Sequence, residues 1–190
     1  VFSILLTGAF HEDGLADTAD GLGGGLTRER ALDIMKDSRV GAYGAIALVM
    51  ALFSKLALLV LLHELDARWA IAGLFAAHVT SRLMPLFIIR TMAHVGDTPQ
   101  SKSKPLAESI SSAGVIAGLM WWLAAMVLAS QFLPLAPLAA AVIGSASGMA
   151  VMAWRLKVRL QGFTGDGLGA TQQLAEIGFY LGLVFSAGLR

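Results

Sequence analysis

Residues 109–154 read SISSAGVIAGLMWWLAAMVLASQFLPLAPLAAAVIGSASGMAVMAW, a stretch without a single Asp, Glu, Lys or Arg. A helix needs about 20 apolar residues to cross a bilayer, so this stretch is long enough for two crossings. Pro134 and Pro137 lie near its middle, where they predict a tight turn. The stretch therefore predicts a hairpin of two membrane-spanning helices.

The whole chain is also rich in apolar residues and poor in charge. Of its 190 residues, 56% are hydrophobic and only 14% are charged. Ordinary soluble domains carry about 25% charged residues. We expect an all-α, polytopic membrane helix bundle, with residues 1–190 forming a single transmembrane catalytic domain. Residues 1–10 predict a truncated N-terminal span of about 15 Å. The apolar segments predict about five full spans: Val40–Leu62, Trp69–Ile89, Ile110–Phe132, Leu135–Trp154 and Gln172–Leu189.

The basic residues predict the orientation of these spans. Alternating crossings place the polar segments 11–39, 90–109 and 155–171 on one side of the membrane. That side collects most Lys and Arg residues, whereas the opposite loops contain only Arg68. By the positive-inside rule the basic side is cytoplasmic, so we expect the polar segments to face the cytoplasm. A net charge of +1 gives no indication of nucleic-acid binding, and the lack of cysteine excludes disulfides and thiolate metal sites.

Four carboxylates lie close together in the sequence His11-Glu12-Asp13-Gly14-Leu15-Ala16-Asp17-Thr18-Ala19-Asp20-Gly21. In a helix, Asp13, Asp17 and Asp20 share one face. Their charges would repel by about 3 kcal/mol per pair at about 6 Å, so a bound cation is expected among them. Oxygen ligands suit Mg²⁺, and Mg²⁺ held in this way usually binds phosphate. The alternative is that the two Asp-Gly pairs form ordinary solvated turns.

Two basic residues follow this cluster and suit a diphosphate. Lys36 and Arg39 are three residues apart, on one face if the helical pattern of 28–39 continues, and they flank Asp37 and Ser38. We expect Lys36, Ser38 and Arg39 to contact substrate phosphate and Asp37 to be a candidate catalytic residue. Alternatively, the two cations lie at the membrane interface or pair with Asp33 and Asp37.

Two further charges lie inside predicted spans. A charge at mid-bilayer costs about 2.5–3.5 kcal/mol, so Lys55 and Arg82 should face a cavity or a partner. Arg82 is the better candidate for a substrate contact, whereas Lys55 is equally suited to pairing with a carboxylate. Thr164-Gly165-Asp166-Gly167 precedes the last span, and Asp166 could complete the metal site or accept a proton. The alternative for this motif is a glycine-rich turn.

These motifs together resemble the cobalamin synthase family, the adenosylcobinamide-GDP ribazoletransferases. The resemblance is carried by Gly8–Gly21, Ile34–Gly41 with Tyr43-Gly44, Ser81-Arg82 and Gly162–Ala170. It implies a Mg²⁺-dependent enzyme of the bacterial inner membrane, with its active site facing the cytoplasm. This enzyme joins adenosylcobinamide-GDP to α-ribazole or its 5′-phosphate and releases GMP, in the last assembly stage of cobalamin biosynthesis. It also implies the following roles: Asp13, Asp17 and Asp20 as metal ligands; Lys36, Ser38, Arg39, Arg82, Thr164 and Gly165 as substrate contacts; Asp166 or Glu12 as the proton acceptor.

Three other functions remain open from the sequence. The acidic cluster partly resembles that of the CDP-alcohol phosphotransferases, but Asp17 stands where their motif has Arg. A membrane prenyltransferase would present a second aspartate-rich motif, and a divalent-cation transporter would place carboxylates near its spans. Residues 91–109 predict a surface loop or lid. The small residues Gly144, Ala146 and Gly148 allow close helix packing, either within the chain or in a homo-oligomer.

Overall fold

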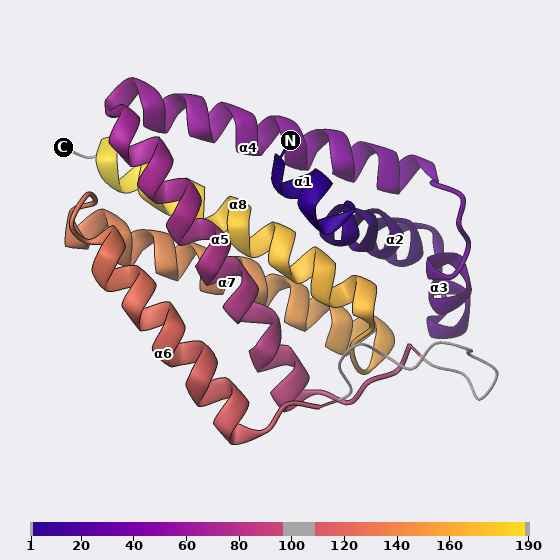
Figure 1. The fold of residues 1–190 in the computed structure, drawn as a ribbon. Helices are drawn as coiled ribbons and strands as arrows, with labels where there is room; N and C mark the ends of the chain where they lie inside the picture. The colour runs from indigo at the N-terminus through magenta and orange to yellow at the C-terminus, as the bar shows by residue number, and fades with distance from the viewer. Residues whose placement is uncertain (1, 97–108, 189–190) are drawn as a thin grey trace.

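The computed structural model describes residues 2–96 and 109–188, which form helices and no strand (Figure 1). The loop expected over 91–109 therefore lies mostly outside the described residues. The elements in chain order are α1 (Phe2–Thr7), α2 (Phe10–Gly24), α3 (Arg28–Met35), α4 (Ala42–Leu65), α5 (Ala67–Thr91), α6 (Ser112–Ala129), α7 (Leu135–Leu160) and α8 (Gly165–Gly188).

Among the described residues, four helices are long and apolar enough to cross a membrane: α4, α5, α6 and α7. These four confirm the corresponding predicted spans, including the hairpin within 109–154. In the most apolar windows of α4 and α6 only 17% of residues are buried inside the protein, so their apolar side chains face outward. Such surfaces are stable when lipid covers them, which indicates a membrane protein.

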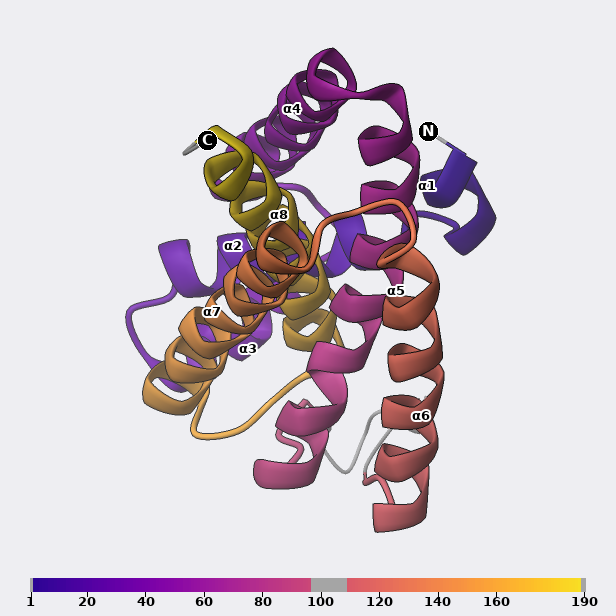
Figure 2. The same ribbon diagram turned by 90° about the vertical axis from the view of Figure 1, so that its left-hand side faces the viewer.

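The fifth predicted span, Gln172–Leu189, corresponds to α8, which begins earlier, at Gly165. This helix lies at the centre of the bundle, where it packs against α7, α2, α5 and α4 (Figure 2). Its buried residues include the polar Gln172, Gln173 and Glu176. These polar side chains find hydrogen-bond partners inside the protein because neighbouring helices surround α8. By its composition, α8 is not among the four described helices that are apolar enough to cross a membrane.

Small residues bring α7 and α8 into close contact. A Cβ on Gly144 would overlap the carbonyl of Gly178, and a Cβ on Gly148 would lie 2.5 Å from the carbonyl oxygen of Leu174. Both distances are shorter than real Cβ contacts, so only glycine fits at this interface. The close packing predicted for Gly144 and Gly148 is confirmed, and it occurs within one chain.

The N-terminal segment differs from the expected truncated span. Gly8 and Ala9 have φ values of 63° and 59°, in the left-handed region. A right-handed helix cannot continue through two such residues, so α1 ends at Thr7 and α2 starts in a new direction at Phe10. The helix assumed for the acidic cluster is confirmed, because α2 contains every residue from Asp13 to Asp20.

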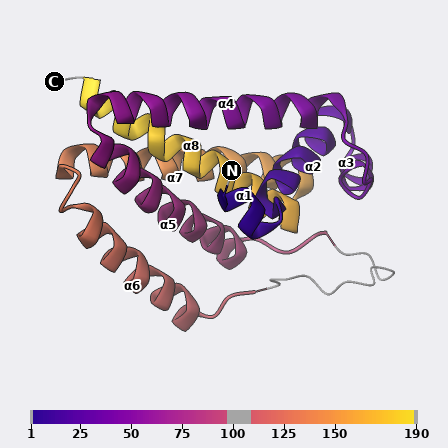
Figure 3. The same cartoon turned by 45° about the horizontal axis from the view of Figure 1, so that its top comes forward.

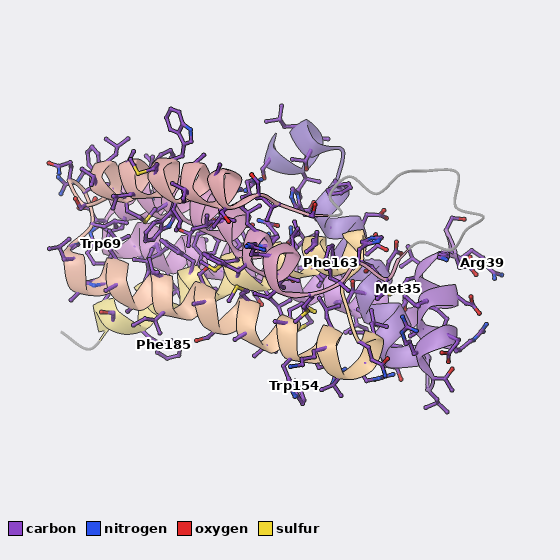
Figure 4. The ribbon with its side chains drawn as sticks, turned by 90° about the horizontal axis from the view of Figure 1, so that it is seen from below. Met35, Arg39, Trp69, Trp154, Phe163 and Phe185 are labelled. Atoms are coloured by element: carbon purple, nitrogen blue, oxygen red, sulfur yellow. The ribbon has the colours of Figure 1, made fainter. Side chains whose placement is uncertain are left out.

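The three basic segments meet at one end of the bundle, as predicted. Val95 and Phe163 form backbone hydrogen bonds across two segments, with Val95 N donating to Phe163 O at 2.9 Å and Phe163 N donating to Ala93 O at 2.9 Å. Arg28 Nε donates to Leu160 O at 2.7 Å, and Arg159 donates to carbonyls at the end of α2. Figure 4 shows Met35, Arg39 and Phe163 toward this end and Trp69 at the opposite one.

Candidate functional site

Two glycines bring α2 against the start of α8. A Cβ on Gly14 would lie 2.8 Å from the backbone oxygen of Asp166, and a Cβ on Gly169 would lie 3.3 Å from the Cα of Gly14. The two backbones are therefore in direct contact at this level. Because Asp13 and Asp17 flank Gly14 on α2, this contact brings three carboxyl groups from distant parts of the sequence together.

These carboxyl groups act on one another electrostatically. Burial, followed by the charges of Asp13, Asp166 and Asp20 in that order, raises the pKa of Asp17 to about 7. Burial and then the charge of Asp13 also raise the pKa of Asp166. Within residues 2–96 and 109–188, no hydrogen bond or ion pair reaches the side chains of Asp13, Asp17 and Asp166. The cluster thus concentrates negative charge that a cation would stabilise.

Asp20 makes a structural contact that the sequence did not predict. Its side chain is buried, and it accepts hydrogen bonds from Gly41 N at 2.7 Å and from Gly44 N at 2.9 Å. Gly41 immediately precedes α4 and Gly44 lies in its first turn, where backbone donors lack partners within the helix. Asp20 therefore caps α4 across the bundle, and its expected role as a metal ligand stays a prediction.

The remaining carboxylates suit Mg²⁺ rather than a closed protein cage. In the part of the chain that the structure describes, no group of three or more His, Asp or Glu side chains is arranged to hold a metal ion. Mg²⁺ normally keeps several waters and binds to one or two carboxylates together with substrate phosphates. Asp13 and Asp17, with Asp166 beside them, offer oxygen donors of this kind. The donor chemistry fits Mg²⁺ bound jointly with a diphosphate.

The prediction that Lys36 and Arg39 share one face of a helix is wrong. The helix α3 ends at Met35, so the residues that follow do not keep helical spacing. Arg39 instead binds Asp37, with Nη2 to Oδ2 at 2.6 Å and Nε to Oδ1 at 3.0 Å, as the alternative interpretation had it. Both side chains are exposed to solvent, at 87% and 38%. Lys36 and Ser38 are exposed in the same segment.

This pairing argues against Asp37 as a proton acceptor. The side-chain hydrogen bond from Arg39, followed by its backbone hydrogen bond, lowers the pKa of Asp37 to about 2. A carboxylate with so low a pKa is a weak base at neutral pH. Asp37 therefore orients Arg39 in the structure, and Glu12 and Asp166 stay the predicted proton acceptors.

Thr164 and Gly165 form the start of α8. Thr164 is only 4% exposed, and its Oγ1 accepts a hydrogen bond from Gly167 N at 3.0 Å. This side chain caps the helix, so its expected substrate contact gains no support. Gly165 is different, since a Cβ there would meet no atom within 4 Å. Open space therefore lies next to Asp166 at the N-terminus of α8, where the helix dipole favours anions.

A buried polar network surrounds Glu176, and the sequence did not predict it. Lys55 Nζ lies 2.8 Å from Glu176 Oε2 and donates to Gln173 Oε1 at 2.6 Å. Gln172 Nε2 and Tyr180 OH also donate to the Glu176 carboxylate, at 3.0 and 3.1 Å. The interpretation of Lys55 as a partner of a carboxylate is confirmed. The signal for the rest was Glu176 itself, an ionisable residue in an apolar segment.

Glu12 and Arg82 lie beside this network. Glu12 Oε1 accepts a hydrogen bond from Gln173 Nε2 at 3.0 Å, whereas its Oε2 is buried without a hydrogen-bond partner. Arg82 Nη1 donates to His78 Nδ1 at 2.8 Å and to the His78 carbonyl at 3.0 Å. Among the described residues no carboxylate forms an ion pair with Arg82. The expected site residues thus fall into two groups. Asp13, Asp17 and Asp166 form the aspartate cluster, whereas Glu12 and Arg82 lie beside the buried Lys55–Glu176 pair.

The comparison with known proteins decides between the functions left open by the sequence. Residues 1–184 match the family profile described as cobalamin-5-phosphate synthase. The chain belongs to the cobalamin-5-phosphate synthase family. This result confirms the resemblance carried by the acidic, basic and glycine-rich motifs.

Curated members of the cobalamin-5-phosphate synthase family are similar along nearly the whole chain. The adenosylcobinamide-GDP ribazoletransferase of Albidiferax ferrireducens is 54% identical over 95% of this chain and 69% of its own length. The relative of that name from Polaromonas naphthalenivorans is 50% identical, with coverages of 98% and 71%. The relative from Vibrio cholerae is 46% identical, with coverages of 95% and 67%. No solved structure matches significantly.

In this cobalamin-5-phosphate synthase family member, the raised pKa of Asp17 makes stability depend on pH. The folded pKa of about 7 exceeds the usual unfolded value of about 3.9, so the folded state binds the proton more tightly. This stabilisation is complete at low pH and is lost as the pH rises through 7. We expect the unfolding temperature of the metal-free protein in detergent to fall as the pH rises from about 4 to about 7 and to level off above pH 7. An Asp17→Asn variant should show a flatter profile; an equal slope in both proteins would contradict this assignment.

Removal of the Lys55 charge should destabilise the protein, because the buried network contains the Lys55–Glu176 ion pair. A Lys55→Met substitution leaves Glu176 unpaired with its side chain only 5% exposed. Loss of one partner of a buried ion pair costs about 3–5 kcal/mol, so the unfolding temperature should drop markedly. The double variant Lys55→Met/Glu176→Gln removes both charges and should recover part of the loss. If the double variant is no more stable than the single one, the ion pair does not hold α4 to α8.

Proposed function

We propose that this protein transfers the adenosylcobinamide phosphate group of adenosylcobinamide-GDP to α-ribazole or its 5′-phosphate. The products are adenosylcobalamin, or its 5′-phosphate, and GMP. The observation that carries the proposal is the meeting of Asp13, Asp17 and Asp166, whose mutual repulsion suits a Mg²⁺-bound diphosphate. The names of relatives up to 54% identical supply the substrates.

The location of the site follows from the same arrangement. The aspartate cluster lies toward the end of the bundle where the basic segments meet (Figure 3 shows α2 and α3 beside the start of α4). By the positive-inside rule this end faces the cytoplasm, so we place the enzyme in the bacterial inner membrane with the lipid bilayer around α4 to α7. The glycines of α7 already pack on α8, so they give no reason to expect a homo-oligomer.

The reaction is a displacement at phosphorus. The ribose 3′-hydroxyl oxygen of the acceptor forms a bond to the cobinamide-side phosphorus, and the bond from that phosphorus to the bridging oxygen breaks, so GMP leaves with that oxygen. The hydroxyl proton passes to a carboxylate, for which Glu12 is placed best because its Oε2 has no hydrogen-bond partner. Asp13 and Asp17 would hold Mg²⁺, with Asp166 beside them. When bound, this ion supplies positive charge that stabilises the diphosphate.

The direct test is GMP release by the purified protein. The protein in detergent or lipid nanodiscs is incubated with Mg²⁺, adenosylcobinamide-GDP and α-ribazole, and GMP is quantified by chromatography. We expect GMP and a cobalamin product in equal amounts, and no GMP when EDTA removes the metal or when α-ribazole is omitted. Absence of product together with Mg²⁺ flux into liposomes would instead identify a divalent-cation transporter.

A further inference from the structure

A cavity of about 750 Å³ opens among α1, α2, α4, α5 and α8, deeper in the bundle than the aspartate cluster. Its ionisable lining residues are Glu12, Lys55, His78, Arg82 and Glu176. Small-molecule sites usually have volumes of about 300–1,000 Å³ and combine apolar walls with a few polar groups. The apolar walls here are provided mainly by Leu52, Leu56, Leu59 and Leu74. The cavity therefore has the size and composition of a site for an amphipathic molecule.

The charges around the cavity exclude a diphosphate as its occupant. Lys55 and Arg82 are balanced by Glu12 and Glu176, so the four charges sum to zero, and Lys55 is already paired with Glu176. A diphosphate would meet two carboxylates and only one cation without an ion-pair partner. A neutral molecule with hydroxyl groups meets no such repulsion, and it can use both the acceptor on Glu12 and the donors on Arg82.

Glu12 connects this cavity to the aspartate cluster. It precedes Asp13 on α2, yet it lines the cavity, and its buried Oε2 has no hydrogen-bond partner. A buried oxygen without a partner is costly, so a donor from a ligand would stabilise it. A molecule in the cavity would thus place a hydroxyl at Glu12, which immediately precedes Asp13, one of the residues proposed to hold the Mg²⁺-bound diphosphate.

We propose that this cavity is the binding site of the acceptor nucleoside, an inference that rests on the proposed function. The nucleoside's benzimidazole ring packs between the leucines of α4 and α5, and its ribose points toward Glu12. Glu12 Oε2 accepts the hydrogen bond of the attacking hydroxyl, and Arg82 donates to the ribose oxygens. The two substrates therefore bind at different places: the diphosphate of the donor binds at the aspartate cluster, and the acceptor binds in the cavity.

The test fills the cavity and measures each substrate separately. Leu74 lines this cavity, whereas its neighbour Phe75 lines another, mostly apolar one, and the two side chains are similarly exposed at 40% and 42%. We expect Leu74→Trp to raise the KM for α-ribazole at least tenfold and to change the KM for adenosylcobinamide-GDP less than twofold. The control Phe75→Trp should leave both values within twofold. Equal shifts in both KM values, or a shift for the donor alone, would overturn the proposal.

A binding measurement separates this proposal from the proposed function. Equilibrium dialysis of α-ribazole against the wild-type protein without donor needs no turnover, and Leu74→Trp should weaken the binding at least tenfold. Leu56→Trp on α4, with the exposed Leu61→Trp as its control, repeats the test if the first variant fails to fold. Binding without GMP release would contradict the proposed function only. Unchanged α-ribazole binding in folded Leu74→Trp or Leu56→Trp protein would overturn the acceptor site.

Discussion

Asp17→Asn is expected to lower the rate of GMP formation by about 10²–10³-fold while raising the unfolding temperature of the metal-free protein at pH 8. The loss of rate follows because loss of one charge-stabilising group in a site of this kind typically has that effect. The gain in stability follows because burial and the charges of Asp13, Asp166 and Asp20 raise the pKa of Asp17 to about 7. At pH 8 the folded state must hold that charge, and an amide removes it.

Asp20→Asn is the matched control, since it makes the same chemical change one turn further along α2. Asp20 accepts hydrogen bonds from Gly41 N and Gly44 N, so the amide variant loses one acceptor and brings an NH₂ group toward backbone donors. We expect a lower unfolding temperature, from a loss of about 1–3 kcal/mol. The two variants are compared by thermal unfolding in detergent and by GMP release across Mg²⁺ concentrations. Full activity of Asp17→Asn at low Mg²⁺ would remove Asp17 from the metal site.

Gly14→Ala should have the second large effect, through the geometry of the site. The new methyl group would lie 2.8 Å from the Asp166 backbone oxygen, which belongs to α8 and cannot move aside as a side chain would. The helices must separate, and overpacking of this kind costs about 1–3 kcal/mol. A displacement of about 1 Å between reacting groups can cost about 10²-fold in rate. We therefore expect a loss of activity larger than the loss of stability accounts for.

Gly24→Ala on the same helix provides the control for this change. A Cβ on Gly24 would lie 3.5 Å from Ile34 Cδ1, an ordinary contact. Because alanine is the better helix former, this variant should be as stable as the wild type or slightly more so, with unchanged GMP release. Equal activity in the Gly14→Ala and Gly24→Ala proteins would show that the close approach of α2 and α8 does not position the site.

The sequence alone determined the class of fold and the meeting of the basic segments at one end of the bundle. The charge-free stretch 109–154 is confirmed as the hairpin of α6 and α7, because apolar length and the absence of charge are local properties of the chain. The family was also determined by local motifs, such as the acidic run in α2 and the segment that starts α8. Such features depend on residue type and spacing, and both can be counted in a sequence.

The partners of each charged group depended on the tertiary structure. Periodicity placed Asp20 with Asp13 and Asp17, but the start of α4 lies close enough to occupy its oxygens. Likewise, the end of α3 at Met35 left Arg39 free to bind Asp37. A sequence gives the face of one helix, whereas a carboxylate pairs with whichever donors other helices bring near. The contact of Gly14 with Asp166, more than 150 residues away in the sequence, is of this kind, since only the packing of α2 on α8 creates it.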